Sequence, residues 1–545
     1  MQCKRKGDSA ALAAQECPLG SRELSNESVG RAIDASRATW RWSVGGLLLL
    51  ALALRVLSAV VAHPIRPDSV HYIHTAENLA EGRFSLAFSG LGPNLYPAIL
   101  IGLKQLGLDY ETAGRLWGVF ISTITLLPLL GLVRMMFGRK LALISGFLYA
   151  VHPRFIEWGP ELMRDPTFWF CFLLALYAIH KAYNNGKTRW FLLAGVGFLA
   201  AIHLRIEGWL LLFPFAVLAA SRLHYPAIRR RLRQIAIGAA IVLVAVAGLC
   251  YANGTWSDEA PIWGRFHGMV ALIQSKLGAA GAAAQAAMDY GRPPERQVVH
   301  FFKKYQKAVV PWLLVPALVG VYRLRRRMWS AEYAADWGIA LLNLAMVAAY
   351  LAIFSEINTR YFMTGTLLLF PYMAYGTVVI VRHARRFLRA AAKGTPAVRW
   401  AAPVAAMLLI TGGLSGVFVD RSALLWQYSV GTWIRANYGE DTKVAYWRPY
   451  SLVEYYANAS QTVLLSPDQQ QWEETLQIAA PDIVLANLDT EVGRSFRQYV
   501  EQHPEFGYRL LERFDELTQR DVLVYVRQAT REIVAQGAAG TSGNR

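Results

Sequence analysis

The sequence predicts a polytopic α-helical membrane protein that carries a small C-terminal α/β domain. Of its 545 residues, 54% are hydrophobic and only 17% are charged, whereas soluble domains carry about a quarter charged residues. Long apolar runs recur up to residue 420, and several approach the roughly 20 residues that a membrane-spanning helix needs. Beyond that point, short segments rich in valine, leucine and tyrosine alternate with helical patterns, which is typical of an α/β domain.

The amino-terminal residues 1–39 are polar and have no periodic apolar face, so we expect a disordered tail. The first apolar run, residues 44–62, begins too late and is too long for a cleaved signal peptide. Basic residues precede this run, among them Arg37 and Arg41. We therefore expect an uncleaved first span with the tail in the cytoplasm.

Eleven spans are expected in a membrane domain of residues 40–420, and the positions of the basic residues support that number. Eleven alternating spans that start inside put every strongly basic loop on the cytoplasmic side. The other side then receives Asp68, Glu161, Asp165 and Glu207. The spans are expected near residues 44–62, 113–133, 141–151, 167–183, 190–203, 208–220, 235–251, 309–322, 337–354, 361–381 and 400–419.

Three outer loops are expected, at residues 63–112, 152–166 and 252–308. The first loop carries a predicted helix at 69–81, which Gly82 ends. The third loop ends at residues 295–307, where apolar and aromatic side chains alternate with lysines and a histidine. That pattern predicts a helix lying in the membrane interface, with its lysines toward anionic headgroups.

The C-terminal α/β domain is expected at residues 421–531, on the outer face, and a disordered tail at 532–545. Strands are rich in β-branched, leucine and tyrosine residues, and helices are expected between them. The predicted strands are 442–447, 460–465, 481–488 and 521–526, and the predicted helices are 451–458, 468–478 and 491–502.

The distribution of charge and the cysteine spacing argue against a nucleic-acid-binding protein and against a protein stabilised by a disulfide framework. The formal net charge is +18, but the arginines cluster in short loops between apolar runs, as positive-inside topology requires. We therefore expect no nucleic-acid partner. The four cysteines, Cys3, Cys17, Cys171 and Cys250, have no metal-ligand spacing and predict no disulfide framework.

Asp68 follows the first span within His63-Pro64-Ile65-Arg66-Pro67-Asp68-Ser69-Val70-His71-Tyr72. A carboxylate at this boundary can take a proton from an attacking hydroxyl, as a general base does. The alternative is a helix N-cap, because aspartate caps helices well. Nearby aromatic side chains, including Tyr72 and Tyr96, can stack on sugars or mark the membrane interface.

The second outer loop holds Glu161, Arg164 and Asp165. Glu161 and Asp165 are four residues apart, so on a helix they share one face and need a cation between them. Arg164, a divalent metal or a cationic substrate would each satisfy that need, and ordinary interfacial charge is the structural alternative. No histidine stands at ligand spacing, so a metal is only weakly indicated.

Arg360 and Tyr361 open a late span, against the positive-inside trend. A guanidinium there needs an anion, and a lipid phosphate fits its planar fork. Pairing with Glu356 is the structural alternative. Arg205 and Glu207 form a similar outer pair, whose nearness favours a structural bridge.

These features together resemble integral-membrane glycosyltransferases of the GT-C fold, near the protein O-mannosyltransferase and aminoarabinose transferase groups (glycosyltransferase families 39 and 83). The resemblance extends from residue 62 to residue 375. Its stretches are Arg66-Pro67-Asp68-Ser69 with Tyr72, Asn94-Leu95-Tyr96-Pro97, His152-Pro153 with Glu161 and Asp165, Leu204-Arg205-Ile206-Glu207-Gly208, and Arg360-Tyr361 with Pro371.

The resemblance implies a polyprenyl-phosphate-linked sugar as donor and inversion at the anomeric carbon. It implies Asp68 as the base, Asp165 or Glu161 as a second acid, and Arg360 near the lipid phosphate. The acceptor is a hydroxyl or amine on a glycan, lipid or protein. Many relatives have Asp-Glu in the first loop, whereas Ser69 follows Asp68 here, which puts a paired-acid arrangement in doubt.

The resemblance and the basic loops together suggest the inner membrane of a bacterium, with a periplasmic C-terminal domain. Two other classes remain open at this point. A transporter of lipid-linked sugars would place charges facing one another inside the membrane, and a non-catalytic scaffold would tolerate the loss of Asp68.

Overall fold

The computed structural model describes residues 26–89, 94–226, 229–230, 233, 294–354, 357–391, 407–439, 442–446, 451–459, 461–465, 469–514, 521–528 and 530. The chain divides into two compact units, Met1–Leu47 and Leu48–Arg545. Every contact below lies within the second unit. The expected span 235–251, most of the third outer loop, Glu356 and both termini lie outside the described residues.

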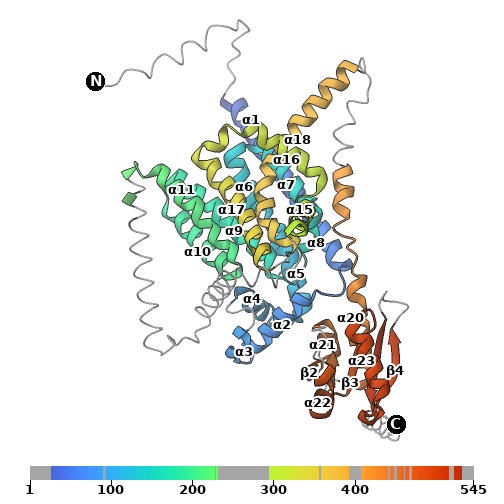
Figure 1. Ribbon diagram of the computed structural model, residues 1–545. Helices are drawn as coiled ribbons and strands as arrows, with labels where there is room; N and C mark the ends of the chain where they lie inside the picture. The colour runs from blue at the N-terminus through green and yellow to red at the C-terminus, as the bar shows by residue number, and fades with distance from the viewer. Residues whose placement is uncertain are drawn as a thin grey trace. The chain divides into compact units, whose positions relative to one another are not determined.

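Helices form the described part of the membrane region (Figure 1). They are α1 (Asn26–Val61), α2 (Pro67–Ala80), α3 (Phe84–Ser89), α4 (Leu95–Lys104), α5 (Tyr110–Ile124), α6 (Leu126–Phe137), α7 (Arg139–Ala150), α8 (Pro153–Trp158), α9 (Arg164–Asn185), α10 (Thr188–Leu204), η1 (Ile206–Leu211), α11 (Leu212–Arg222), α15 (Pro294–Val309), α16 (Pro311–Leu324), η2 (Arg327–Trp329), α17 (Ala331–Phe354), η3 (Thr359–Phe362) and α18 (Met363–Ala391). The first helix begins at Asn26, so residues 26–39 are helical rather than part of the expected disordered tail.

Four helical segments among the described residues are long and apolar enough to cross a membrane, and the protein is an integral, multi-pass membrane protein. They are Ala38–Val61, Tyr110–Phe137, Ala331–Ala352 and Thr359–Arg386. A fifth span results if Arg296–Val309 and Pro311–Leu324, which bend by 87° at their junction, count as one.

The expected number of eleven spans is therefore not reached in the part of the chain that the structure describes. The predicted spans at 141–151 and 208–220 correspond to α7 and α11, with 12 and 11 residues, and 190–203 corresponds to α10, with 17. At 1.5 Å of rise per residue, the two shorter helices reach only part of the way across a bilayer.

Small residues let α16 and α18 approach closely. A Cβ atom on Gly320 would lie 2.0 Å from the carbonyl oxygen of Tyr372, and one on Gly376 would lie 1.8 Å from that of Pro316. Glycine at such positions allows two membrane helices to pack backbone against backbone.

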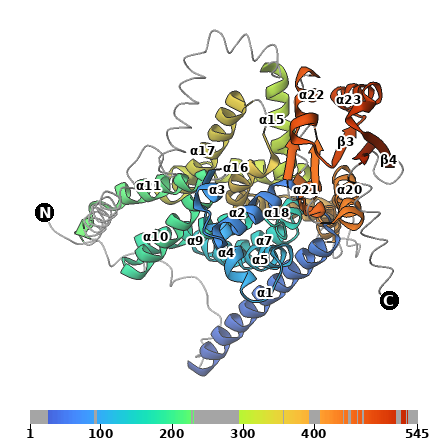
Figure 2. The ribbon, with the colours of Figure 1, turned by 90° about the horizontal axis from the view of Figure 1, so that it is seen from below.

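The predicted helix at 69–81 is confirmed as α2, two residues longer at its start. Pro67 suits the first helical position, where its missing N–H costs nothing, and Asp68 lies in the first turn, where negative charge is favoured. Helices α2, α3 and α4 lie side by side at one end of the helical region (Figures 1 and 2). The predicted interfacial helix at 295–307 is confirmed as a helix, α15.

The C-terminal region contains a five-stranded mixed sheet with strand order β2-β1-β3-β5-β4. Strands β1, β2 and β3 are parallel, β5 is antiparallel to β3, and β4 is antiparallel to β5. The elements are α20 (Ser422–Tyr438), β1 (Lys443–Tyr446), α21 (Ser451–Ala457), β2 (Gln461–Leu464), η4 (Gln469–Gln471), α22 (Trp472–Glu474), η5 (Thr475–Ala479), β3 (Ile483–Asn487), α23 (Glu491–Gln502), η6 (Pro504–Phe506), β4 (Tyr508–Phe514) and β5 (Val522–Arg527).

Both faces of this sheet are covered by apolar side chains. Val444 and Ile483 pack with Val430 of α20 on one face, and Val484 packs with Phe496 of α23 on the other. All four predicted strands are confirmed. The fifth, β4, was missed because it is an edge strand whose sequence contains three charged residues, and charged edges are common in natural sheets.

We expect Gly376→Ala to destabilise the protein, because the added methyl group must push α16 and α18 apart. Overpacking of this kind costs about 1–3 kcal/mol. The measurement is the thermal unfolding midpoint in detergent. Gly195→Ala on α10 is the matched control, since a Cβ there meets no atom within 4 Å. Equal midpoints for the two variants would contradict the close packing.

Candidate active site

Asp68 and Arg360 meet although 292 residues separate them. Arg360 Nη1 lies 2.5 Å from Asp68 Oδ2. Arg360 sits in η3, where its backbone N–H donates a hydrogen bond to the Asn358 side chain. The Asp68 side chain is 50% exposed and the Arg360 side chain 17%. The N-cap of α2 is Arg66, not Asp68, so the carboxylate is engaged with Arg360 rather than with the helix end.

Arg205 pairs with two buried carboxylates. Its guanidinium forms an ion pair with Asp165 and donates hydrogen bonds of 3.1 and 3.0 Å from Nε to the two oxygens of Glu207. All three side chains are buried. The expected bridge between Arg205 and Glu207 is present, and Asp165, forty residues earlier, joins it.

Asp165 is held as a carboxylate by the arginines around it. Its burial alone would raise its pKa, but the charges of Arg205, Arg360 and Arg164 outweigh this effect and hold the pKa below the usual value. Its second oxygen, Oδ2, has no hydrogen-bond partner among the described residues. One oxygen of this ionised carboxylate is therefore buried without a hydrogen bond.

Arg164 lies beside this cluster without an ion pair to any described residue. Its Nε is buried and without a partner, as is the Nε of Arg360. The charge of Arg164 acts on Asp165, on Tyr72 and on His71. Each of the two arginines thus has a guanidinium N–H that no described residue accepts.

Aromatic side chains surround the charges. The rings of Tyr72 and Tyr96 meet edge to face with centroids 5.2 Å apart, and both are buried. The guanidinium carbons of Arg205 and Arg360 lie 5.3 and 5.6 Å from the ring centroid of Tyr361. His71 is exposed on the same helix as Asp68.

Glu161 belongs to a second, adjacent network. Helix α9 starts at Arg164, so Glu161 precedes it, and the expectation that Glu161 and Asp165 share a helix face is wrong. Glu161 Oε1 accepts a hydrogen bond of 3.0 Å from Arg66 Nε and also pairs with Arg421. Arg66 Nη2 reaches Glu157 at 2.9 Å.

Sequence patterns indicated most of these residues but not Arg421. Arg421 gave no local signal, because it stands alone at the start of the C-terminal region. No group of three or more histidine, cysteine, aspartate or glutamate side chains within the described residues is arranged to hold a metal. The carboxylates of the site form ion pairs with arginines.

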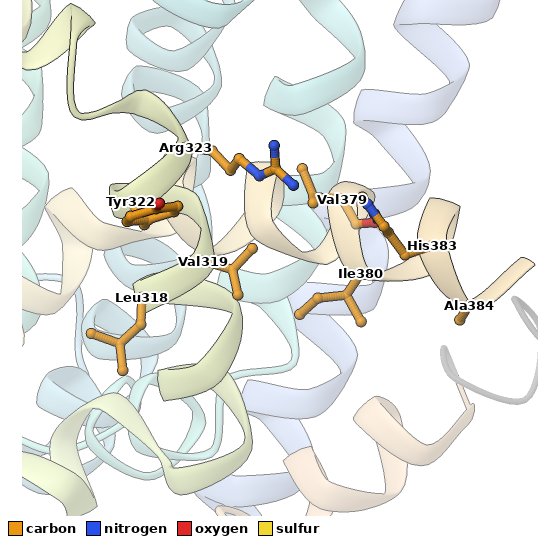
Figure 3. Close-up of a pocket in the computed structure, with 8 residues that line it drawn as sticks. All are labelled: Leu318, Val319, Tyr322, Arg323, Val379, Ile380, His383 and Ala384. Atoms are coloured by element: carbon orange, nitrogen blue, oxygen red, sulfur yellow. The ribbon is translucent and has the colours of Figure 1, made fainter. Parts of the chain in front are cut away.

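An apolar groove between α16 and α18 lies apart from this cluster (Figure 3). It is lined by Leu318, Val319, Tyr322, Arg323, Val379, Ile380, His383 and Ala384. Arg360 precedes the start of α18, whereas the groove lies near the opposite end of that helix, so the groove is not part of the candidate site.

Residues 92–251 match the family described as dolichyl-phosphate-mannose-protein mannosyltransferase. The structure is similar to that of ArnT from Cupriavidus metallidurans, with a TM-score of 0.53, 14% identity, and coverage of 89% of this chain and 98% of that one. It is also similar to the Archaeoglobus fulgidus oligosaccharyltransferase, with a TM-score of 0.50, 14% identity and coverage of 85% and 71%. Curated protein sequences give no match.

These findings confirm the resemblance drawn from the sequence. The chain has a fold similar to those of ArnT and the oligosaccharyltransferase, as the expected GT-C fold requires. Its residues 92–251 carry the mannosyltransferase-family region, which includes the second loop acids and the Arg205 pair.

Arg205→Met should destabilise the protein strongly, because it leaves the buried Asp165 and Glu207 without the arginine that forms ion pairs with both. Removing one member of a buried ion pair costs about 3–5 kcal/mol. The measurement is the apparent free energy of unfolding in mixed micelles. Arg222→Gln is the control: its pair with Glu332 is partly exposed and is worth about 0–1 kcal/mol. Similar losses of unfolding free energy in both variants would show that the ion pairs of Arg205 stabilise the protein no more than the exposed pair of Arg222 does.

Proposed function

We propose that the protein transfers a sugar from a polyprenyl-phosphate donor to a hydroxyl or amine acceptor, with Asp68 as the general base. The observation that carries this proposal is the contact between half-exposed Asp68 and Arg360, beside unpaired Arg164. A base and two phosphate-binding groups thus lie together at the end of a span. The site belongs to the proposed membrane domain, residues 40–420.

The reaction balances with these groups. The acceptor oxygen or nitrogen forms a bond to the anomeric carbon while the bond from that carbon to the phosphate oxygen breaks. Asp68 takes the proton of the acceptor, and the leaving phosphate takes the electron pair. Arg360 and Arg164 stabilise the charge that develops on this phosphate. Attack from the face opposite the phosphate inverts the anomeric carbon.

The ion pair between Asp68 and Arg360 supports an order of events. Without donor, Arg360 is bound to the carboxylate. A donor phosphate can bind a guanidinium through two hydrogen bonds, whereas Asp68 accepts only one from Arg360. The phosphate therefore competes for Arg360 and frees the Asp68 carboxylate for the acceptor. The base thus becomes available when the donor is bound.

Asp165 is the better second acid in this proposal. It is ionised, and its Oδ2 has no hydrogen-bond partner among the described residues, so it suits a role in orienting the acceptor or the donor sugar. Glu161 is buried and shares one oxygen between Arg66 and Arg421. Tyr72, Tyr96, His71 and Tyr361 would then line the sugar and phosphate positions.

The description of the matching family supports only part of the proposed donor. The matching family is described by dolichyl-phosphate mannose and protein, which supports a lipid-phosphate sugar here. The proposed setting is the inner membrane of a bacterium. The proposed C-terminal domain, residues 421–531, would face the periplasm together with the site.

Asp68→Asn should lower the transfer rate at least about a hundredfold, because the amide cannot take the acceptor proton. The measurement is transfer of radiolabelled sugar from polyprenyl-phosphate donors in membranes that carry each variant. Glu81→Gln, which follows α2 directly and is exposed, is the control and should transfer at the wild-type rate. Equal transfer by wild type and Asp68→Asn would remove Asp68 from the mechanism.

Arg164→Gln should weaken binding of polyprenyl phosphate about tenfold or more, since a hydrogen bond to a charged group is worth about 1.5–3 kcal/mol. The measurement is the dissociation constant for polyprenyl phosphate in detergent. Arg83→Gln is the control, because Arg83 is exposed and pairs with Glu81. An unchanged constant for Arg164→Gln would exclude Arg164 from the phosphate site.

A further inference from the structure

The start of α2 is held by residues of the C-terminal region. Arg421, the N-cap residue of α20, is buried. Its Nη1 donates a hydrogen bond of 2.5 Å to the carbonyl oxygen of Pro64, and its Nη2 pairs with Glu161. One side chain therefore bridges the C-terminal region to both outer loops that supply the candidate site.

Glu161 continues this bridge to α2 itself. The same carboxylate oxygen accepts a hydrogen bond from Arg66 Nε at 3.0 Å. Arg66 also stacks on Trp158, with its guanidinium carbon 4.0 Å from the ring centroid. Because Arg66 is the N-cap of α2 and stands two residues before Asp68, any shift of this network moves the first turn of the helix.

A second connection comes from α21. The backbone N–H of Ile65 donates a hydrogen bond of 3.4 Å to the hydroxyl of Tyr456, which donates one of 3.4 Å to Glu111. The ring of His63 lies 4.7 Å from that of Tyr428 and 6.4 Å from that of Tyr456. Residues 63–65 are therefore contacted by side chains from both α20 and α21.

We infer that Arg421 is a positioning residue for sugar transfer, and that the C-terminal region is thereby a working part of the active site. Arg421 touches neither Asp68 nor Arg360, so it acts through Glu161, Arg66 and the Pro64 carbonyl. Its role is to fix the backbone that leads into Asp68. This inference rests on the proposed function for its catalytic consequence, but its structural part stands on the contacts alone.

The expected effect follows from geometry. Without Arg421, the Pro64 carbonyl loses a buried donor and Glu161 keeps a single arginine, so the first turn of α2 becomes more mobile. A displacement of the base by about 1 Å can cost about a hundredfold in rate. The phosphate-binding arginines are not touched, so KM for the donor should stay within about threefold while kcat falls about tenfold to a hundredfold.

The experiment uses the full-length protein in detergent, with Arg421→Gln, Arg421→Lys and Arg497→Gln. Arg497 is the matched control, because it is an exposed arginine of the same region that pairs with Glu501 on α23. Two quantities are measured: backbone hydrogen exchange of residues 62–72, and kcat and KM for transfer from a polyprenyl-phosphate sugar. Thermal unfolding midpoints verify that each variant is folded.

We expect backbone hydrogen exchange in residues 62–72 to accelerate at least about threefold in Arg421→Gln and not to change in Arg497→Gln. Arg421→Lys should recover part of kcat, since an ammonium group can satisfy one of the two acceptors. Unchanged exchange in Arg421→Gln would overturn the inference, even if the wild type transferred no sugar and the proposed function failed. Accelerated exchange with an unchanged kcat would overturn its catalytic part.

Discussion

Arginine–carboxylate pairing at the loops is the constraint on which the candidate site depends. Buried charges cost several kcal/mol each unless they are paired and hydrogen-bonded. The loops bury Asp165, Glu207, Glu157 and Glu161, and each is neutralised by an arginine from a distant part of the chain or from its own loop. These pairs contribute little net stability, but they fix where the loops lie.

The pair of Asp68 and Arg360 differs from the buried pairs in its exposure. Because the Asp68 side chain is half exposed, water and ions screen its interaction, and such pairs are worth about 0–1 kcal/mol. A weak pair can exchange partners, whereas Arg205 cannot leave Asp165 and Glu207 without stranding two buried acids. The structure therefore combines a rigid frame of buried pairs with one pair that is free to open.

The features of the fold that depend on local sequence patterns were predicted from the sequence. Helix α2, the strands β1, β2, β3 and β5, and the bridge between Arg205 and Glu207 follow from periodicity, composition and short spacing. The contact of Asp165 with Arg205, and that of Glu161 with Arg421 across 260 residues, depend on the folded arrangement of the helices. The spacing of residues along the sequence does not predict that arrangement. The break between η1 and α11 was hidden for a related reason, because the apolar run continues across it.

The choice between Glu161 and Asp165 shows what geometry adds to a motif. In the sequence the two acids are equivalent, since both lie in the second loop within four residues. In the structure, Glu161 faces Arg66 and Arg421 on the side of the C-terminal region, and Asp165 faces Arg205 and Arg164 on the side of Arg360. Glu161 forms ion pairs with two arginines, Arg66 and Arg421, whereas Asp165 forms one, with Arg205. In the proposed mechanism, Glu161 therefore holds the loop that leads to Asp68, and Asp165 lies among the arginines proposed to bind the donor.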